Sequence, residues 1–194
     1  MSEFGTHIGI ARARSGAIRS ETRVPRSSAV DEAHVRAALA EVMDPELPML
    51  SVVDLGIIHR VDVAAERDGG SIAVEILPTF VGCPALELIK VSIADRLAEF
   101  GRPVAVTATF EVPWTSERIS ARGRAALAAA GIAPPREAAI GDASGALIGL
   151  EPPVACPHCG SRRTVVENLF GPTQCRTIRY CTDCRQPFES IKSV

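Results

Sequence analysis

The chain has 194 residues, and its apolar fraction of 46% and charged fraction of 23% are those of a folded globular protein. A net charge of −2 and an aromatic content of 4% argue against nucleic-acid binding, which usually needs a positive field and stacking surfaces. No apolar run approaches the ~20 residues of a membrane span and no secretory apolar segment opens the chain, so we expect a cytoplasmic protein without membrane contact.

Residues 1–28 are predicted to form a disordered tail, because arginines lie there among serine, glycine and alanine with little apolar content. Transit peptides share this arginine-rich, acid-poor composition. The lack of a clear apolar face favours the tail. The arginines are Arg12, Arg14, Arg19, Arg23 and Arg26.

Ordered structure is expected to begin near Asp31, which suits the N-cap of a helix. Val35, Leu39 and Val42 follow at helical spacing. The helix should end before Pro45, because the residue that precedes a proline avoids the α conformation.

The next segment alternates strands and helices. Its clearest signals are the hairpin sequence Asp68-Gly69-Gly70 and a helix that opens on Pro84 and stops at Gly101. The expected elements are strands at 57–65 and 71–77, a helix at 84–100, a strand at 103–112 and a helix at 116–130.

These elements predict an α+β fold in two parts. The first is a small α/β domain of order α-β-β-α-β, with a three-stranded mixed sheet and helices on one face. The second is a C-terminal zinc ribbon. The expected divisions are the tail at 1–28, the α/β domain with an added helix at 29–131, a linker at 132–153 and the ribbon at 154–194.

Two C-x₂-C pairs define the predicted ribbon. Cys156 with Cys159, and Cys181 with Cys184, would place four thiolates around one metal ion. Cysteines in a cytosolic chain indicate metal or thiol chemistry rather than disulfides. We expect a structural zinc ion, and a rubredoxin-like iron site with the same ligands remains an alternative.

Cys175 lies in the ribbon but outside both pairs. One interpretation is a small residue buried in the ribbon. The other is an extra thiolate that takes part in metal exchange.

Cys83 lies directly before Pro84, near the start of the strongest predicted helix. Helix N-termini favour thiolate over thiol, so we expect a lowered pKa for Cys83. A purely structural cysteine is the alternative. No histidine or asparagine is placed to form a nucleophile pair with it, so hydrolytic or acyl-transfer catalysis is poorly supported.

Two motifs resemble a known family. The segment Met43 to Pro48, followed by Ser51 to Ile58, resembles the opening of the domain shared by SufT-type iron–sulfur assembly proteins and cytosolic iron–sulfur targeting factors. Leu77 to Ala85 resembles the reactive-cysteine loop of that family. The resemblance implies that Cys83 is the functional thiol and that Thr79 and Asp54 support its loop.

With a four-cysteine ribbon added, the chain resembles the PaaD family, also named PaaJ, of phenylacetyl-CoA oxygenase accessory proteins. The ribbon part of the resemblance includes Phe170 to Cys175 and Tyr180 to Cys184. It implies a non-catalytic maturation factor for the ring 1,2-epoxidase, which assembles or delivers a metal centre with a transient iron–sulfur cluster. The expected partner is an oxygenase or reductase client with an iron centre, and a homodimer or a client's thiols would complete the cluster.

Three alternatives stay open. An integral oxygenase subunit is disfavoured, because the chain has no Glu-x-x-His pair for di-iron chemistry. A thiol-dependent enzyme would act through Cys83. A regulatory ribbon that binds nucleic acid or protein would use a basic patch, which is more often a solvated face. That patch would consist of Arg162, Arg163, Arg176, Arg179 and Arg185.

Overall fold

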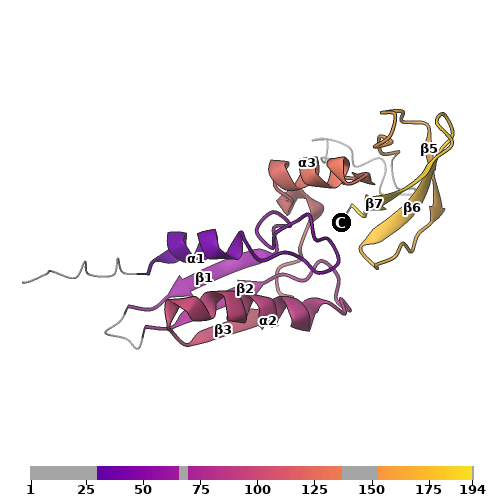
Figure 1. Ribbon diagram of the computed structural model, residues 1–194. Coiled ribbons are helices and arrows are strands. Elements are labelled where there is room, and N and C mark those ends of the chain that lie inside the picture. The colour runs from indigo at the N-terminus through magenta and orange to yellow at the C-terminus, as the bar shows by residue number, and fades with distance from the viewer. Residues whose placement is uncertain (1–29, 66–69, 137–152, 194) are drawn as a thin grey trace, which may run out of the picture.

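The computed structural model describes residues 30–65, 70–136 and 153–193, which form an α/β domain and a smaller ribbon (Figure 1). The tail expected at 1–28 and most of the linker expected at 132–153 lie outside these residues. None of the described helices has the length and apolar character needed to cross a membrane.

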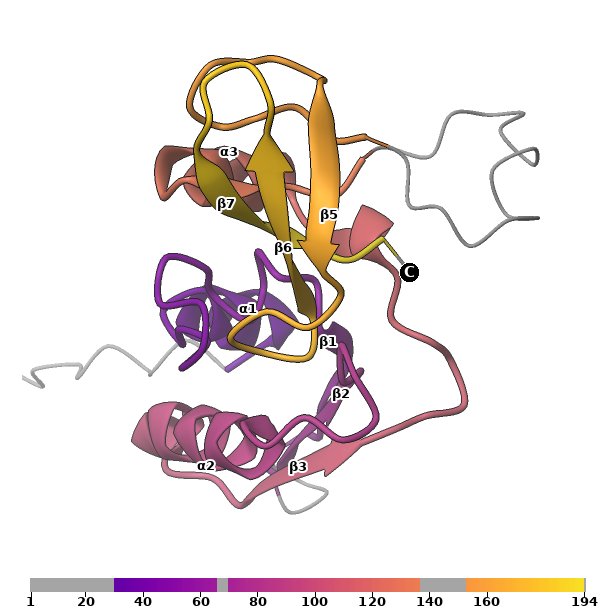
Figure 2. The same cartoon turned by 90° about the vertical axis from the view of Figure 1, so that its right-hand side faces the viewer.

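A three-stranded mixed sheet forms the centre of the α/β domain. β1 (Ile58–Val63) pairs antiparallel with β2 (Ile72–Ile76), and β2 pairs in parallel with β3 (Val104–Ala108). α1 (Glu32–Leu39) and α2 (Leu86–Leu97) cover one face of this sheet (Figure 2). The predicted order α-β-β-α-β and the mixed sheet are therefore confirmed.

Both helices form within their predicted segments, although α1 ends at Leu39, before Val42, and α2 begins at Leu86 rather than at Pro84. The Asp31 carboxylate caps α1 by accepting a hydrogen bond from the backbone N–H of His34 at 3.0 Å. α2 runs into a short 3₁₀ turn, η2 (Ala98–Phe100), which Gly101 ends with a left-handed φ of 65°. The buried residues of the two helices are Val35, Ala38, Leu39, Ile89, Ile93 and Leu97.

The ribbon is a four-stranded sheet in the order β4-β7-β6-β5. β5 (Thr164–Asn168) and β6 (Arg176–Cys181) form the expected antiparallel hairpin, and β7 (Pro187–Ile191) adds a strand that the sequence pattern did not indicate. β4 (Ile132–Ala133), at the start of the expected linker, pairs in parallel with β7. This short strand ties the preceding helix, α3 (Ala121–Ala129), to the ribbon.

The added helix expected at 116–130 is two elements. η3 (Ser116–Arg118) is a single 3₁₀ turn, and α3 follows it after a break at Ile119 and Ser120. The Ser120 hydroxyl caps α3 by accepting a hydrogen bond from the backbone N–H of Gly123 at 2.9 Å. The helix α3 therefore starts after the break because serine is a favourable N-cap residue.

The two parts share one hydrophobic core. The main buried cluster fills the space between the sheet, α1 and α2, and it also includes Ile132 and Ile191 from the ribbon sheet. The ribbon's own buried cluster is much smaller: Ala133, Val154, Cys156, Cys181 and Phe188. So small a core needs additional stabilisation, which a bound metal ion can supply.

Candidate functional site

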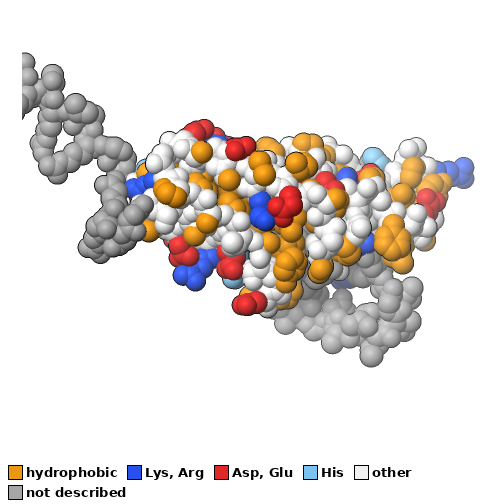
Figure 3. Space-filling model, turned by 90° about the horizontal axis from the view of Figure 1, so that it is seen from below, with side chains coloured by type: hydrophobic (Ala, Val, Ile, Leu, Met, Phe, Trp, Pro, Cys, Tyr) orange, Lys and Arg blue, Asp and Glu red, His pale blue; other side chains and the backbone are white. Residues whose placement is uncertain are grey.

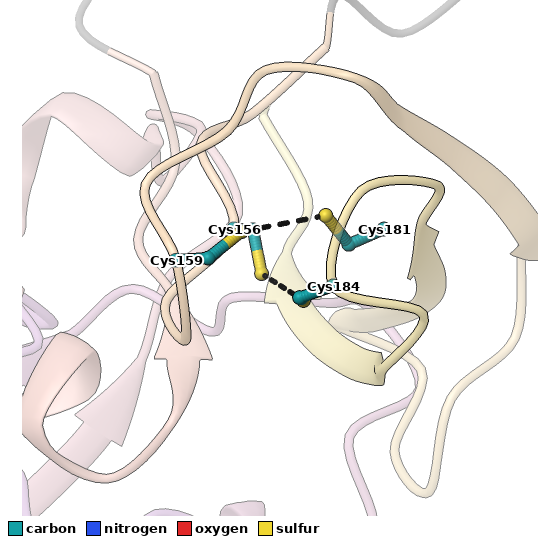
Figure 4. A group of neighbouring side chains, drawn as sticks. All are labelled: Cys156, Cys159, Cys181 and Cys184. Atoms are coloured by element: carbon teal, nitrogen blue, oxygen red, sulfur yellow. Dashed lines mark hydrogen bonds between the residues drawn. The ribbon is translucent and has the colours of Figure 1, made fainter.

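Four cysteine side chains converge at one end of the ribbon (Figure 4). Cys156 and Cys159 precede β5, Cys181 ends β6, and Cys184 lies in the turn before β7. Their four sulfur atoms all lie within 4.8 Å of one another. Among the described residues, this is the one group of three or more histidine, cysteine or carboxylate side chains close enough to hold a metal ion together.

The sulfur separations fit a tetrahedral metal site. The Sγ atoms of Cys156 and Cys184 are 3.7 Å apart, and those of Cys159 and Cys181 are 3.6 Å apart. Four sulfurs at ~2.3 Å from a zinc ion stand at tetrahedral corners about 3.8 Å apart. The four thiols can therefore close around one ion with little movement.

Local backbone geometry favours the thiolate form of a ribbon ligand. The backbone N–H of Cys184 is the main cause that lowers the pKa of Cys181 to about 7, whereas burial raises the pKa of Cys184 to about 12. Of these two thiols, Cys181 is the one that more readily becomes the thiolate that binds metal. His158, which lies within the first cysteine pair, is exposed and packs edge-on against the Phe188 ring at 6.5 Å. It is not a member of the ligand group.

A second thiol site lies where the α/β domain meets the ribbon. Cys83 and Cys175 line one cavity of about 20 Å³, together with Asp44, Glu46 and Thr79. Apolar side chains from both parts of the chain complete the wall. This volume is room for about one water-sized sphere.

The local structure around Cys83 contradicts the expected lowering of its pKa. α2 begins at Leu86 with Ala85 as its N-cap, so Cys83 lies in the turn before the helix. Burial raises the pKa of Cys83, and the nearby carboxylates of Glu46 and Asp44 raise it further. The expected lowering of the Cys83 pKa was therefore wrong: a backbone hydrogen bond from Ala85, the N-cap residue, lowers this pKa, but burial outweighs it.

Alkylation tests this corrected state of Cys83. We expect the rate of its reaction with iodoacetamide to rise mainly above about pH 9, because the thiolate is the nucleophile and the thiol pKa is raised. Peptide mapping by mass spectrometry would follow Cys83 apart from the ribbon thiols. Half-maximal reactivity near pH 7 would contradict the raised pKa.

Of the two residues expected to support the Cys83 loop, the structure places Thr79 in the cavity wall. Asp54 is not among the residues that line the cavity. Its carboxylate accepts hydrogen bonds from Arg122 at 2.6 and 3.0 Å, from Ser120 at 2.7 Å and from Ser51 at 2.9 Å. Asp54 thereby holds the start of α3 against the loop that follows α1.

The Asp54 network gives a pH-dependent stability. Burial alone would raise the pKa of Asp54, but the hydrogen bonds from Arg122, Ser120 and Ser51 lower it below its usual value. A lowered folded-state pKa stabilises the fold above the unfolded value of about 3.9, and this stabilisation is lost as the pH falls through the folded pKa.

We therefore expect Asp54→Asn to lower the free energy of unfolding by about 1–3 kcal/mol at pH 7. Urea titrations over a pH series should show that the difference in free energy of unfolding between Asp54→Asn and the natural chain disappears below about pH 4. The control Arg122→Gln should cost less than about 1 kcal/mol, because the Arg122 side chain is 70% exposed. A difference that does not change with pH would mean that the Asp54 charge is not involved.

The structure does not form the basic ribbon patch considered above. Arg179 is 2% exposed and donates to the Ser190 hydroxyl at 2.9 Å. The Arg176 side chain is 11% exposed and pairs with Glu189 at 2.7 Å. Arg163 pairs with Asp183 at the surface. Two of the five arginines are therefore largely withdrawn from solvent, so the five do not form one exposed basic patch.

Two cavity residues carried no functional expectation from sequence. Trp114 is 6% exposed and donates its indole N–H to the Leu55 carbonyl at 3.0 Å. Glu46 follows Asp44 in the loop after α1, and its proximity to Cys83 depends on tertiary packing. For Trp114, the sequence did offer one signal: it is the single tryptophan of a chain that is poor in aromatic residues.

Comparisons with known families match both parts of the chain. Residues 32–109 match the family described as "Iron-sulfur cluster assembly protein", and residues 141–192 match the family described as "PaaD zinc beta ribbon domain". The first match covers the sheet, α1, α2 and Cys83. The second covers all four ribbon ligands and Cys175.

Relatives show the same two similarities. The chain is 33% identical over 159 residues to an Escherichia coli protein named as a putative subunit of 1,2-phenylacetyl-CoA epoxidase, covering 81% of this chain and 90% of that protein. It is 33% identical over 84 residues to a Porphyromonas gingivalis "Fe-S protein maturation auxiliary factor", covering 42% and 76%. It is 29% identical over 101 residues to a Mycobacterium leprae "Iron-sulfur cluster carrier protein", covering 52% of this chain and a quarter of that one.

Proposed function

The chain belongs to the PaaD family, which includes the Escherichia coli epoxidase subunit, and on this basis we propose that it is a maturation factor of the 1,2-phenylacetyl-CoA epoxidase. In this role it assists the assembly or delivery of an iron–sulfur or other iron centre to an oxygenase or reductase client. It acts before turnover and does not itself catalyse the oxygenation.

The observation that carries this proposal is the separation of two thiol sites. The ribbon thiols face one another and leave no ligand position open once a metal is bound. The cavity of Cys83 and Cys175 has two carboxylates and a hydroxyl beside its two thiols, and the described residues form no complete ligand set there. A closed site suits a structural ion, and an incomplete site suits a centre that is passed on.

We assign zinc to the ribbon. The four-sulfur site offers no exchangeable position, and zinc is the common ion of closed tetrahedral cysteine sites. Its contribution is to the folding of a domain with a small apolar core. This ion takes no part in the proposed delivery.

The surface around Cys83 supports contact with another protein. Apolar side chains are exposed on the Cys83 loop and on α2. Figure 3, which views the molecule from below the view of Figure 1, shows apolar groups lying among charged ones on that side. Exposed apolar groups of this kind often belong to protein interfaces. The exposed residues are Phe80 at 43%, Val81 at 79%, Leu88 at 62% and Val91 at 56%.

Reconstitution of the client tests the proposal. The iron–sulfur protein of the epoxidase is loaded anaerobically with and without this chain, and bound iron is followed with time. We expect the natural chain to accelerate loading and Cys83→Ser to reduce the rate to that without the chain. Glu87→Ser, on the exposed first turn of α2, is the control and should act as the natural chain does. Equal loading in all four reactions would overturn the proposal.

An integral subunit of the epoxidase is the second candidate, favoured by the name of the Escherichia coli relative. The two candidates differ in what the mature enzyme needs. A maturation factor can be removed after assembly without loss of turnover, whereas removal of an integral subunit abolishes it. Turnover measured before and after depletion of this chain from the mature complex decides between them.

A further inference from the structure

Cys175 is held at the Cys83 cavity by a set of defined contacts. Its sulfur lies 3.1 Å from the Thr173 hydroxyl, and its carbonyl accepts from the backbone N–H of Lys192 at 3.0 Å. The Thr173 hydroxyl also accepts a hydrogen bond from Arg176 at 2.9 Å. The turn that carries Cys175 is thus fixed from both sides, and the Cys175 sulfur has a defined position.

Arg176 fixes this turn against the α/β domain. Besides Thr173, its guanidinium donates to the Glu189 carboxylate at 2.7 Å and to the backbone carbonyl of Glu46 at 3.4 Å. Glu46 belongs to the loop that lines the cavity together with Cys175. One partly buried arginine therefore joins the ribbon turn, β7 and the loop after α1, and it keeps both thiols at the same cavity.

The electrostatics of the cavity favour a cation over an anion. Burial raises the pKa of Cys175, as it does the pKa of Cys83, so both groups are thiols at neutral pH. Asp44 and Glu46 add negative charge to the same wall, which the nearby Arg176 guanidinium offsets in part. A metal cation would displace the two thiol protons and gain two thiolate ligands beside these carboxylates.

A groove lies next to the cavity of the two thiols and shares Glu46 with it. It has a volume of about 210 Å³ and is lined by Glu46, Pro84, Phe170 and the turn from Gly171 to Gln174. Pro84 follows Cys83 and Gln174 precedes Cys175, while Glu46 lines both the groove and the cavity. A metal centre could therefore enter or leave at the joint between the two domains.

We propose that Cys83 and Cys175 together form a two-thiol site for a thiophilic iron centre, bound across the interface between the α/β domain and the ribbon. The site supplies two of the ligands of an iron ion or cluster and leaves the remaining positions to the client. This inference rests on the proposed function and deepens it, because it gives the ribbon a direct part in holding the cargo.

A trivalent arsenical tests the paired thiols without any client. Phenylarsine oxide condenses with two thiols, forming two As–S bonds and releasing one water, with no change of oxidation state. We expect one such adduct on the full-length, zinc-loaded chain, with a cross-linked peptide that joins Cys83 to Cys175. Cys83→Ser and Cys175→Ser should each weaken the adduct at least about tenfold, because the second thiol then no longer binds intramolecularly.

The zinc content keeps this test specific. Zinc retained at about one ion per chain shows that the ribbon ligands did not react. An adduct that persists in either single variant, or a natural chain without any bridged adduct, would overturn the two-thiol site. If the arsenical bridge forms but Cys83→Ser loads the client with iron as fast as the natural chain does, the proposed function fails and the two-thiol site stands. If loading needs Cys83 but not Cys175 and no bridge forms, the site fails and the function stands.

Discussion

Replacement of Cys181 by serine is expected to abolish tight metal binding and to unfold the metal-binding end of the ribbon. The Cys181 sulfur is one of four that lie within 4.8 Å of one another, and its side chain is fully buried. Structural zinc sites of this type contribute about 10–16 kcal/mol of apparent binding free energy at neutral pH. The five-residue core of the ribbon cannot replace a contribution of that size.

Hydrogen exchange and zinc analysis would measure both effects. We expect the zinc content to fall from about one ion per chain to a small fraction, and the amides of β5 and β6 to lose protection while those of β2 keep it. Cys175→Ser is the matched control, since it makes the same chemical change in the same ribbon outside the ligand group. Unchanged zinc affinity in Cys181→Ser would show that the ribbon binds its metal through other residues.

Gly56→Ala is expected to destabilise the α/β domain by about 3 kcal/mol or more. Gly56 has a φ of 72°, which an L side chain adopts only at a cost. A β-carbon at this position would lie 2.2 Å from the backbone carbonyl oxygen of Arg118. The Arg118 side chain also donates to the Gly56 carbonyl at 2.8 Å, so the two segments cannot separate without breaking that contact.

Gly101→Ala separates the cost of the left-handed backbone conformation from the cost of the steric overlap with Arg118. Gly101 has a similar φ of 65°, but no heavy atom lies within 4 Å of the position of an added β-carbon. Its substitution should therefore cost only the backbone term of about 1–2 kcal/mol. Urea unfolding of both variants gives the comparison, and equal losses would mean that the close approach of Arg118 is relieved without cost.

The secondary structure of the α/β domain was largely predictable because its signals are local. The cap at Asp31 and the apolar stripe of α2 each act within one element, and the structure forms each helix there. The hairpin signal at 68–70 lies mostly outside the described residues, but the strands β1 and β2 that flank it pair antiparallel. The third ribbon strand, β7, was missed since its five residues follow a turn with no strong strand pattern. The pairing of β4 with β7 joins residues more than fifty positions apart, which no local signal indicates.

The candidate sites likewise divide into those set by local sequence and those set by long-range packing. The four ribbon ligands were predictable because each C-x₂-C turn brings two sulfurs together by itself. The proximity of Cys175 to Cys83 depends on how Arg176 and the shared core dock the ribbon onto the α/β domain. The pKa of Cys83 was predicted in the wrong direction, because burial and the carboxylates of the neighbouring loop are tertiary effects.

In our account, the ribbon holds a structural zinc ion while the iron centre to be delivered binds at Cys83. This separation is tested by the metal content of the chain after anaerobic treatment with iron and sulfide. We predict about one zinc ion per chain in both the natural protein and Cys83→Ser. With glutathione added to fill the ligand positions that the chain leaves open, iron with the visible absorption of a cluster should appear in the natural protein and be lost in Cys83→Ser. A cluster that persists without Cys83, or iron that displaces the zinc from the four ribbon cysteines, would contradict the account.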